Sequence, residues 1–285
     1  MKIAWIGTGI MGYEMVSHLC DANYDVSIYN RSLHKTERLK EKATVCHSIA
    51  EVVKDADIIF SIVSLPQDVE QIYLEDGILQ HAKANSICVD MTTSSPTLAK
   101  KISDQAMERK IRVLDAPVSG GDVGARNATL TIMVGGDQHA FDQVKELFQK
   151  MGKTITYVGE AGSGQHMKMA NQIAVANNLL GAVESLAYAK TAGLNQSMAI
   201  DVLNGGAAAS WQLQVNGPLM IKHNFNPGFM NVHFIKDLKL VLEEAKRKKL
   251  SLPMIEKIVN MYLAHHEEEF QTQSTVAIYN DYIKS

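Results

Sequence analysis

The feature that most constrains the fold is a glycine-rich turn close to the start of the chain, Gly7-Thr8-Gly9-Ile10-Met11-Gly12. Residues 2–6 before it form a short apolar strand pattern, and apolar residues after it recur at helical spacing. In this context Gly7 allows a tight turn, Gly9 lets a pyrophosphate approach the backbone, and Gly12 lets the helix pack closely on the strand. The positive end of the helix adds attraction for phosphate. The pattern favours a dinucleotide-binding site over a plain tight turn.

The end of the second strand indicates which dinucleotide is used. Residues 25–29 read as a strand, and Asn30-Arg31-Ser32 follow it, where an NAD-selective site usually places an acidic residue against the ribose 2′-hydroxyl. A neutral Asn30 tolerates a 2′-phosphate, and the guanidinium of Arg31 can pair with one. The pattern therefore favours NADP, with NAD possible. The alternative is that Arg31 is an ordinary surface residue and Asn30 only ends the strand.

Strand and helix patterns alternate through the first half of the chain. Strands are expected at residues 2–6, 25–29, 57–61, 86–90, 112–116, 130–134 and 154–158, and helices between them include 33–42 and 137–150. This order predicts a doubly wound α/β sheet, in which ligands lie at the carboxyl ends of the strands. The segments expected at that edge are the glycine-rich turn, Asn30-Arg31-Ser32, Ser64-Leu65-Pro66 and Thr92-Thr93-Ser94.

Residues 117–125 break the alternation with a glycine-rich stretch that contains Ser119, Gly120 and Gly121. We expect a loop here, because the segment has few apolar anchors. Its backbone amides and the Ser119 hydroxyl could hold a small carboxylate. The stretch could equally be a flexible connection.

The longest helix of the chain is expected to follow Gly162 and to end near Ala192, before the helix-stopping Gly193. Lys168, Asn171, Gln172 and Val175 share one face of it, at i, i+3, i+4 and i+7. A lysine and two amides in one stripe are unusual on an apolar helix, and a buried lysine needs a partner or a purpose. Taken alone, Lys168 would read as a solvated residue at a helix start.

The second half of the chain is helical throughout its pattern. Helices are expected at residues 196–203, 210–222, 233–249 and 253–269, with a further segment from 274. Lys236 and Asp237 would then open the first turn of the third of these. We divide the chain into a dinucleotide-binding α/β domain, residues 1–161, and an all-helical domain, residues 162–285, joined by the long interdomain helix.

Composition excludes several other classes of function. The formal net charge of −3 over 285 residues gives no electrostatic reason to bind nucleic acid or an anionic membrane. Cys20, Cys46 and Cys88 lack metal-ligand spacing, and His265-His266 lack a third ligand, so we expect free thiols and no metal site. No targeting segment or membrane span is expected, and the chain reads as cytoplasmic.

Four separated blocks resemble the β-hydroxyacid dehydrogenase family, which includes 3-hydroxyisobutyrate dehydrogenase, tartronate semialdehyde reductase and the glyoxylate/succinic semialdehyde reductases. The blocks are Ile6-Gly-Thr-Gly-Ile-Met-Gly12, Asp115-Ala-Pro-Val-Ser-Gly-Gly121, Gly162-Ser-Gly-Gln-His-Met-Lys-Met-Ala-Asn171 and Lys236-Asp237. The resemblance implies an NAD(P)-binding Rossmann domain and a helical domain that mediates assembly into a homodimer or homotetramer. The family's closing Gly-x-x-Asp-x-Ser segment is only partly kept, because residues 268–277 retain the serine region alone.

The resemblance also implies roles for individual residues. Lys168 corresponds to the catalytic lysine, acting with Asn171 and Ser119. A small carboxylate substrate would be held by Ser119, Gly120, Gly121, Lys168 and Asn171. Thr93 and Lys236 would line the nicotinamide and Asp237 would support them, while Ser64, Leu65 and Pro66 complete the cofactor site.

These expectations describe an oxidoreductase that moves a hydride between NADP, or NAD, and a short-chain hydroxy acid or aldehyde acid, with Lys168 as general acid and base. A non-catalytic NADP-binding module is one alternative, but it would be expected to have lost this lysine. An imine reductase of similar architecture is another, and those enzymes generally replace the lysine. A 6-phosphogluconate dehydrogenase shares the cofactor domain but has a much larger helical domain.

Overall fold

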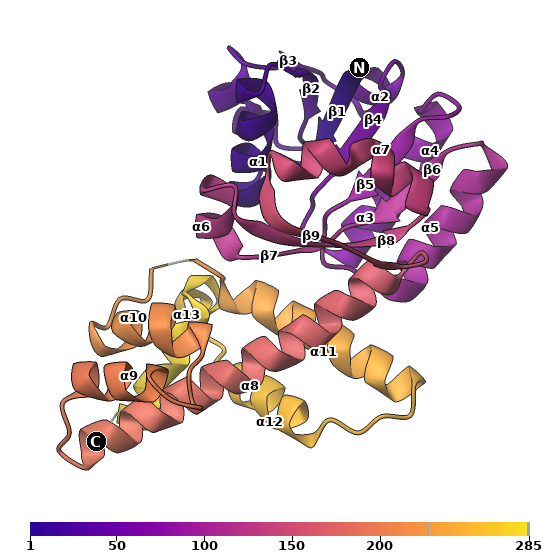
Figure 1. Ribbon diagram of the computed structural model, residues 1–285. Helices are drawn as coiled ribbons and strands as arrows, with labels where there is room; N and C mark the ends of the chain where they lie inside the picture. Colours follow the sequence, from indigo (N-terminus) through magenta and orange to yellow (C-terminus); the bar gives the residue numbers. More distant parts are fainter. Residues whose placement is uncertain (227, 284–285) are drawn as a thin grey trace. The chain divides into compact units, whose positions relative to one another are not determined.

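The computed structural model describes residues 1–226 and 228–283. By its contacts the chain divides into two compact units, Met1–Lys168 and Met169–Ser285. The division falls within α8 (Ser163–Thr191), which Figure 1 shows as one unbroken helix. None of the helices in the described part of the chain is long and apolar enough to cross a membrane.

A nine-stranded sheet forms the centre of the first unit. Its strand order is β3-β2-β1-β4-β5-β6-β8-β7, with β9 paired to β8. The strands from β3 to β6 are parallel, and β8 runs antiparallel to β6. The strands are β1 (Lys2–Ile6), β2 (Asp25–Tyr29), β3 (Thr44–Val45), β4 (Ile58–Ser61), β5 (Ile87–Asp90), β6 (Arg112–Asp115), β7 (Val118–Ser119), β8 (Leu130–Gly136) and β9 (Gly152–Gly159). The predicted doubly wound α/β fold is confirmed.

Each face of the sheet carries its own apolar core, because successive side chains of a strand point to opposite faces. In β1, Ile3 and Trp5 belong to one core, and Ala4 and Ile6 belong to the other. Helices α1 (Ile10–Asp21) and α7 (Gln138–Gln149) pack in the first core. The helices of the second core are α2 (Ile49–Val53), α3 (Pro66–Leu74), α4 (Ile78–His81) and α5 (Pro96–Glu108). Burial on both faces explains the continuous apolar runs of β4 and β5.

Two predictions in the first unit are wrong in detail. The expected loop at residues 117–125 contains strand β7 and helix α6 (Gly121–Arg126). The strand forms because Val118 pairs with Ile132 of β8, so tertiary pairing outweighs the weak local pattern. The expected α-helix at residues 33–42 is instead the 3₁₀ helix η1 (Leu33–Leu39), whose two buried residues, Thr36 and Leu39, are spaced by three.

The second unit is helical over its described residues, apart from an isolated bridge between Met230 and Ser274. Side chains of α8, α11, α12 and η3 share its core. After α8 the elements are α9 (Gln196–Asn204), η2 (Gln212–Asn216), α10 (Gly217–Ile221), α11 (Asn231–Arg247), α12 (Pro253–Leu263), α13 (Glu268–Thr272), η3 (Thr275–Tyr279) and α14 (Asn280–Ile283). The predicted segment from residue 274 extends beyond these described residues at its end.

Three helix predictions in this unit need correction. The helix expected at 210–222 begins with a π-helical turn, η2, before α10, because Pro218 has no N–H to continue a regular ladder. The helix expected at 253–269 is two helices, with His265 between them stacked on Phe270. Helix α11 begins at Asn231, so Lys236 and Asp237 lie in its second turn instead of its first.

Because α1 packs closely on β1, substitutions at two glycines of the turn should differ in their effect on stability. A Cβ at Gly12 would lie 2.0 Å from the carbonyl oxygen of Gly7, whereas a Cβ at Gly9 would meet nothing within 4 Å. Gly12→Ala should lower the free energy of unfolding by about 1–3 kcal/mol, because backbone must shift to admit the methyl group. Gly9→Ala is the matched control and should change it by less than ~1 kcal/mol. Urea unfolding of both variants measures this, and equal losses would contradict the packing argument.

Candidate functional site

The glycine-rich turn lies at the carboxyl end of β1, where it is held from both sides. Gly7 N–H donates to Tyr29 O (2.9 Å), and Trp5 Nε1 donates to Gly7 O (2.8 Å). Thr8 N–H donates to Asn30 Oδ1 (2.9 Å). Helix α1 starts directly after Gly9, which has no side chain to cap it. The turn therefore presents a helix N-terminus beside open space at Gly9, and these features fit the pyrophosphate of a dinucleotide.

The side chains of Asn30 and Arg31, at the end of β2, make different contacts. The Asn30 amide is part of the turn itself, through Thr8 and through its own bond from Nδ2 to Ser32 O (3.0 Å). Arg31 extends outward, and its Nη1 lies 3.1 Å from Oδ1 of Asp68 in the first turn of α3. Neutral Asn30 and cationic Arg31 therefore follow β2 as expected, and the carboxylate of Asp68 beside Arg31 is an addition that the sequence pattern did not predict.

A buried polar network joins the two loops that follow β4 and β5. Ser61 Oγ donates its one hydrogen to Asp90 Oδ1 (3.0 Å). In the contact between Ser61 Oγ and Tyr73 Oη (3.1 Å), the tyrosine is therefore the donor. Thr92 N–H also donates to Asp90 Oδ1 (3.1 Å), and Val63 N–H donates to Thr92 Oγ1 (3.0 Å). Ser64, Leu65 and Pro66 follow Val63, and Thr93 follows Thr92. The network thus fixes two segments that the sequence analysis assigned to the cofactor.

Burial raises the pKa of Asp90 to about 6, and the hydrogen bonds from Thr92 and Ser61 only partly offset it. Burial likewise raises the pKa of Asp115, on the neighbouring strand β6, to about 6. Both carboxyls therefore favour the protonated form more strongly in the folded protein than in the unfolded chain.

Asp115 anchors the first turn of α8 to the sheet. Its Oδ1 accepts from Gly162 N–H (2.8 Å) and its Oδ2 accepts from Gln165 N–H (2.8 Å), which satisfies two of the unpaired donors of a helix start. A Cβ at Gly164 would lie 2.3 Å from Asp115 O and 2.6 Å from Met133 O. Only glycine allows the helix to approach β6 and β8 so closely.

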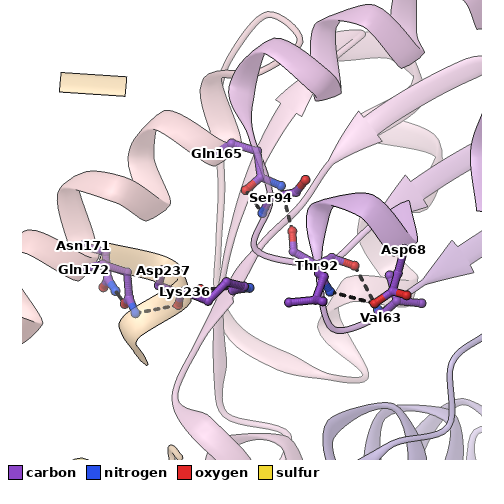
Figure 2. A network of polar contacts seen from close by, with 10 residues as sticks. Val63, Asp68, Thr92, Ser94, Gln165, Asn171, Gln172, Lys236 and Asp237 are labelled. Carbon is purple, nitrogen blue, oxygen red and sulfur yellow. Dashed lines mark hydrogen bonds and ion pairs between the residues drawn. The ribbon is translucent and has the colours of Figure 1, made fainter. Parts of the chain in front are cut away.

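Gln165 adds a second anchor, and its side chain is fully buried. Its Nε2 donates to Thr92 O (2.8 Å), and its Oε1 accepts from Ser94 N–H (2.8 Å), so one amide pairs with the loop as a strand backbone would (Figure 2). Lys168 lies one turn further along α8 and is only 6% exposed. The solvated lysine considered as an alternative is therefore not what the structure contains.

The remaining predicted residues of the first unit, Ser119, Gly120 and Gly121, connect β7 to α6. Ser119 pairs with Thr131 of β8 and is half-buried. A Cβ at Gly121 would meet nothing within 4 Å, so its backbone faces open space.

The predicted residues of the second unit are joined by a relay of side chains. Asn171 Nδ2 donates to Gln172 Oε1 (2.8 Å), and Gln172 Nε2 donates to Asp237 Oδ2 (2.8 Å) (Figure 2). Lys236 Nζ lies 3.0 Å from Asp237 Oδ1, an ion pair that lacks hydrogen-bond geometry. Gln172 and Asp237 are buried, which is why a charge on Asp237 needs these partners. The relay fixes the orientation of Asn171 on α8.

Sequence reasoning missed Asp68, Gln165 and the buried network around Asp90. Gln165 stands inside one of the four blocks, between Gly164 and Lys168, but its type alone does not reveal which loop it binds. Asp68 carried a usable signal, since Pro66 at the first helical position and an acid two residues later mark a helix start.

Two family models of known proteins match consecutive parts of the chain. Residues 2–159 match the model of the NAD-binding domain of 6-phosphogluconate dehydrogenase, and residues 162–282 match a model described as NAD-binding of NADP-dependent 3-hydroxyisobutyrate dehydrogenase. An uncharacterised oxidoreductase of Bacillus subtilis is 42% identical over 99% of both chains. The 2-hydroxy-3-oxopropionate reductase of Escherichia coli is 41% identical, over 89% of this chain and 87% of the reductase.

Among solved structures, 3-hydroxyisobutyrate dehydrogenase of Mycobacterium tuberculosis, described together with L-serine, is similar with a TM-score of 0.90. It is 26% identical, and the match covers 98% of each chain.

The raised pKa of Asp90 predicts a pH-dependent stability difference between the wild type and Asp90→Asn. The folded carboxyl titrates at about 6 and the unfolded one near 3.8, so its stabilising contribution is present below the lower value and is lost as the pH rises through the higher one. The asparagine still accepts from Thr92 and Ser61 but does not titrate. Between pH 4 and pH 7, the free energy of unfolding of the variant should therefore rise by about 1–3 kcal/mol relative to that of the wild type. Urea unfolding across this range measures the gain. Asp115 is present in both proteins, and its charge is the smallest cause of the raised pKa of Asp90, so most of its own contribution cancels. Parallel pH profiles would refute the assignment.

Proposed function

Because the chain belongs to the β-hydroxyacid dehydrogenase family, we propose that it moves a hydride between a nicotinamide cofactor and a short-chain hydroxy acid or the corresponding aldehyde acid. That it is an NAD(P)-dependent oxidoreductase follows from the family. The observation that carries the finer proposal is the buried Lys168, one helical turn beyond the anchor of α8 on the sheet.

The proposed cofactor site begins at the glycine-rich turn. The pyrophosphate would meet the start of α1 beside the open space at Gly9. Asn30, Arg31 and Ser32 would meet the ribose, with NADP preferred over NAD because no acid occupies position 30. The nicotinamide end would be held by Ser64, Leu65, Pro66, Thr93, Lys236 and Asp237.

The chemistry divides between cofactor and protein. When bound, the nicotinamide supplies or accepts the hydride at its C4 atom. In reduction, the ammonium group of Lys168 polarises the carbonyl oxygen of the substrate and gives it a proton as the oxygen becomes an alkoxide. In oxidation, the neutral amine of Lys168 accepts the hydroxyl proton. Asn171, oriented by Gln172, holds the same oxygen from the next turn of α8.

The substrate class follows from the names of the relatives. The compounds named for the E. coli and M. tuberculosis proteins, 2-hydroxy-3-oxopropionate, 3-hydroxyisobutyrate and L-serine, are all carboxylic acids with an oxygen on the third carbon. A small acid of this type would be held at its carboxylate by Ser119, Gly120 and Gly121, through the serine hydroxyl and backbone N–H groups. Reaction would then occur at the oxygen-bearing carbon near Lys168.

The two parts of the chain would contribute differently. We assign most of the cofactor site to residues 1–161, with Lys236 and Asp237 added from the second part. Residues 162–285 would supply Lys168 and Asn171 to the substrate, which Ser119, Gly120 and Gly121 of the first part would also hold, and would mediate assembly into a homodimer or homotetramer. The second assignment rests on the family resemblance.

The catalytic assignment predicts the behaviour of Lys168→Ala. Its kcat/KM for the reduction of 2-hydroxy-3-oxopropionate should fall by about 10²–10⁴-fold, because proton transfer to the alkoxide is lost. Its Kd for NADPH should stay within about threefold of the wild type. Lys190→Ala removes an exposed lysine from the other end of α8 and is the matched control.

NADPH and NADH oxidation, measured with this substrate, glyoxylate and succinic semialdehyde, provides the rates. Near-normal turnover by Lys168→Ala would remove the lysine from the mechanism. Tight NADPH binding by the wild type with no turnover of any short aldehyde acid would overturn the substrate class.

A further inference from the structure

The ion pair between Arg31 and Asp68 crosses the carboxyl end of β1. Arg31 follows β2, whereas Asp68 belongs to α3, which follows β4. In the sheet β1 lies between β2 and β4, so a contact between residues that follow these two outer strands passes over the end of β1. The glycine-rich turn begins at that end. The pair thus lies at the part of the sheet where we place the cofactor's ribose.

The two partners of this pair are held unequally. Asp68 Oδ2 accepts from the backbone N–H of Leu65 (3.1 Å), the residue that precedes the first turn of α3, and the Asp68 side chain is 19% exposed. The Arg31 side chain is 79% exposed. The carboxylate is therefore fixed by its helix, and the guanidinium is the partner that can leave.

We propose that Asp68 is a specificity-determining residue, whose carboxylate neutralises Arg31 and so weakens the protein's preference for NADP over NAD. The inference rests on the proposed function, in which Arg31 meets the 2′-phosphate. A 2′-phosphate requires the guanidinium, so it must compete with Asp68 for Arg31 and is repelled by the carboxylate. The 2′-hydroxyl of NAD carries no charge and meets a neutral pair. Asp68 therefore weakens the binding of NADP and leaves the binding of NAD nearly unaffected.

The expected effect is moderate, because the ion pair is at the surface. An exposed pair and a like-charge contact in water each change binding by a small factor, so removal of the Asp68 charge should change the selectivity by about 3–10-fold. Added salt should reduce this change, because exposed charges are screened.

Asp68→Asn tests the proposal with little disturbance of the fold, since the asparagine oxygen can still accept from Leu65 N–H. We would measure Kd for NADPH and for NADH by the fluorescence of the bound nucleotide, without substrate, at low ionic strength. The Kd for NADPH should fall by about 3–10-fold, while that for NADH stays within about twofold. Glu70→Gln is the matched control, because it removes the same charge from α3 but breaks a pair with Lys101. A thermal melt of each variant monitors the start of α3.

Arg31→Ala separates this inference from the proposed function. In the Arg31→Ala background, Asp68→Asn should give at most about half its gain in NADPH affinity, since the guanidinium that it releases is missing. If Arg31→Ala weakens NADPH binding but Asp68→Asn leaves the ratio of the two Kd values unchanged, Asp68 has no such role and the NADP assignment stands. If Arg31→Ala also leaves the ratio unchanged, the assignment of Arg31 to the 2′-phosphate fails. An equal gain from Glu70→Gln would attribute the effect to net charge and overturn the role of Asp68.

Discussion

The attachment of α8 to the sheet of the first unit is the constraint on which the proposed chemistry depends. Asp115 accepts from the backbone N–H groups of Gly162, just before α8, and Gln165, in its first turn. The Gln165 side chain pairs with the backbone of the loop after β5. Both contacts are buried, so in a low-dielectric setting they hold the helix more firmly than surface contacts would. Lys168 follows one turn later, and a proton donor must be placed within hydrogen-bond reach of the reacting oxygen. The contacts of Asp115 and Gln165 hold the start of α8 in place, and with it the position of Lys168.

Burying two carboxyls is the cost of this arrangement. Asp90 and Asp115 end adjacent strands, directly opposite each other in the sheet register, and burial raises the pKa of both. Their hydrogen bonds go to the loop after β5 and to α8, two segments that we assign to the active site. The two buried carboxyls therefore lower the stability of the fold while they orient these segments, a trade-off that is common at functional sites.

Much of the fold could be predicted from local patterns, because strand–turn–helix units with short connections admit few topologies. The glycine-rich turn, the alternating strands and the unbroken α8 were all visible in that way. The elements that were missed depend on partners distant in the sequence, such as β7, which forms only because β8 lies beside it. Among site residues, Lys168 stood out as a cation on an apolar helix. Gln165 did not, because its value lies in a pairing with the loop at Thr92 and Ser94, more than seventy positions away.

The central claim is that the amine of Lys168 transfers the proton, and chemical rescue tests it most directly. Lys168→Ala should regain part of its lost reductase activity when methylamine or ethylamine is added. The recovered kcat/KM should rise with amine concentration, because a diffusible ammonium ion can replace the missing acid. The wild type should not respond. A Lys168→Ala variant that binds NADPH normally, yet whose rate does not depend on the concentration of any small amine, would contradict the account.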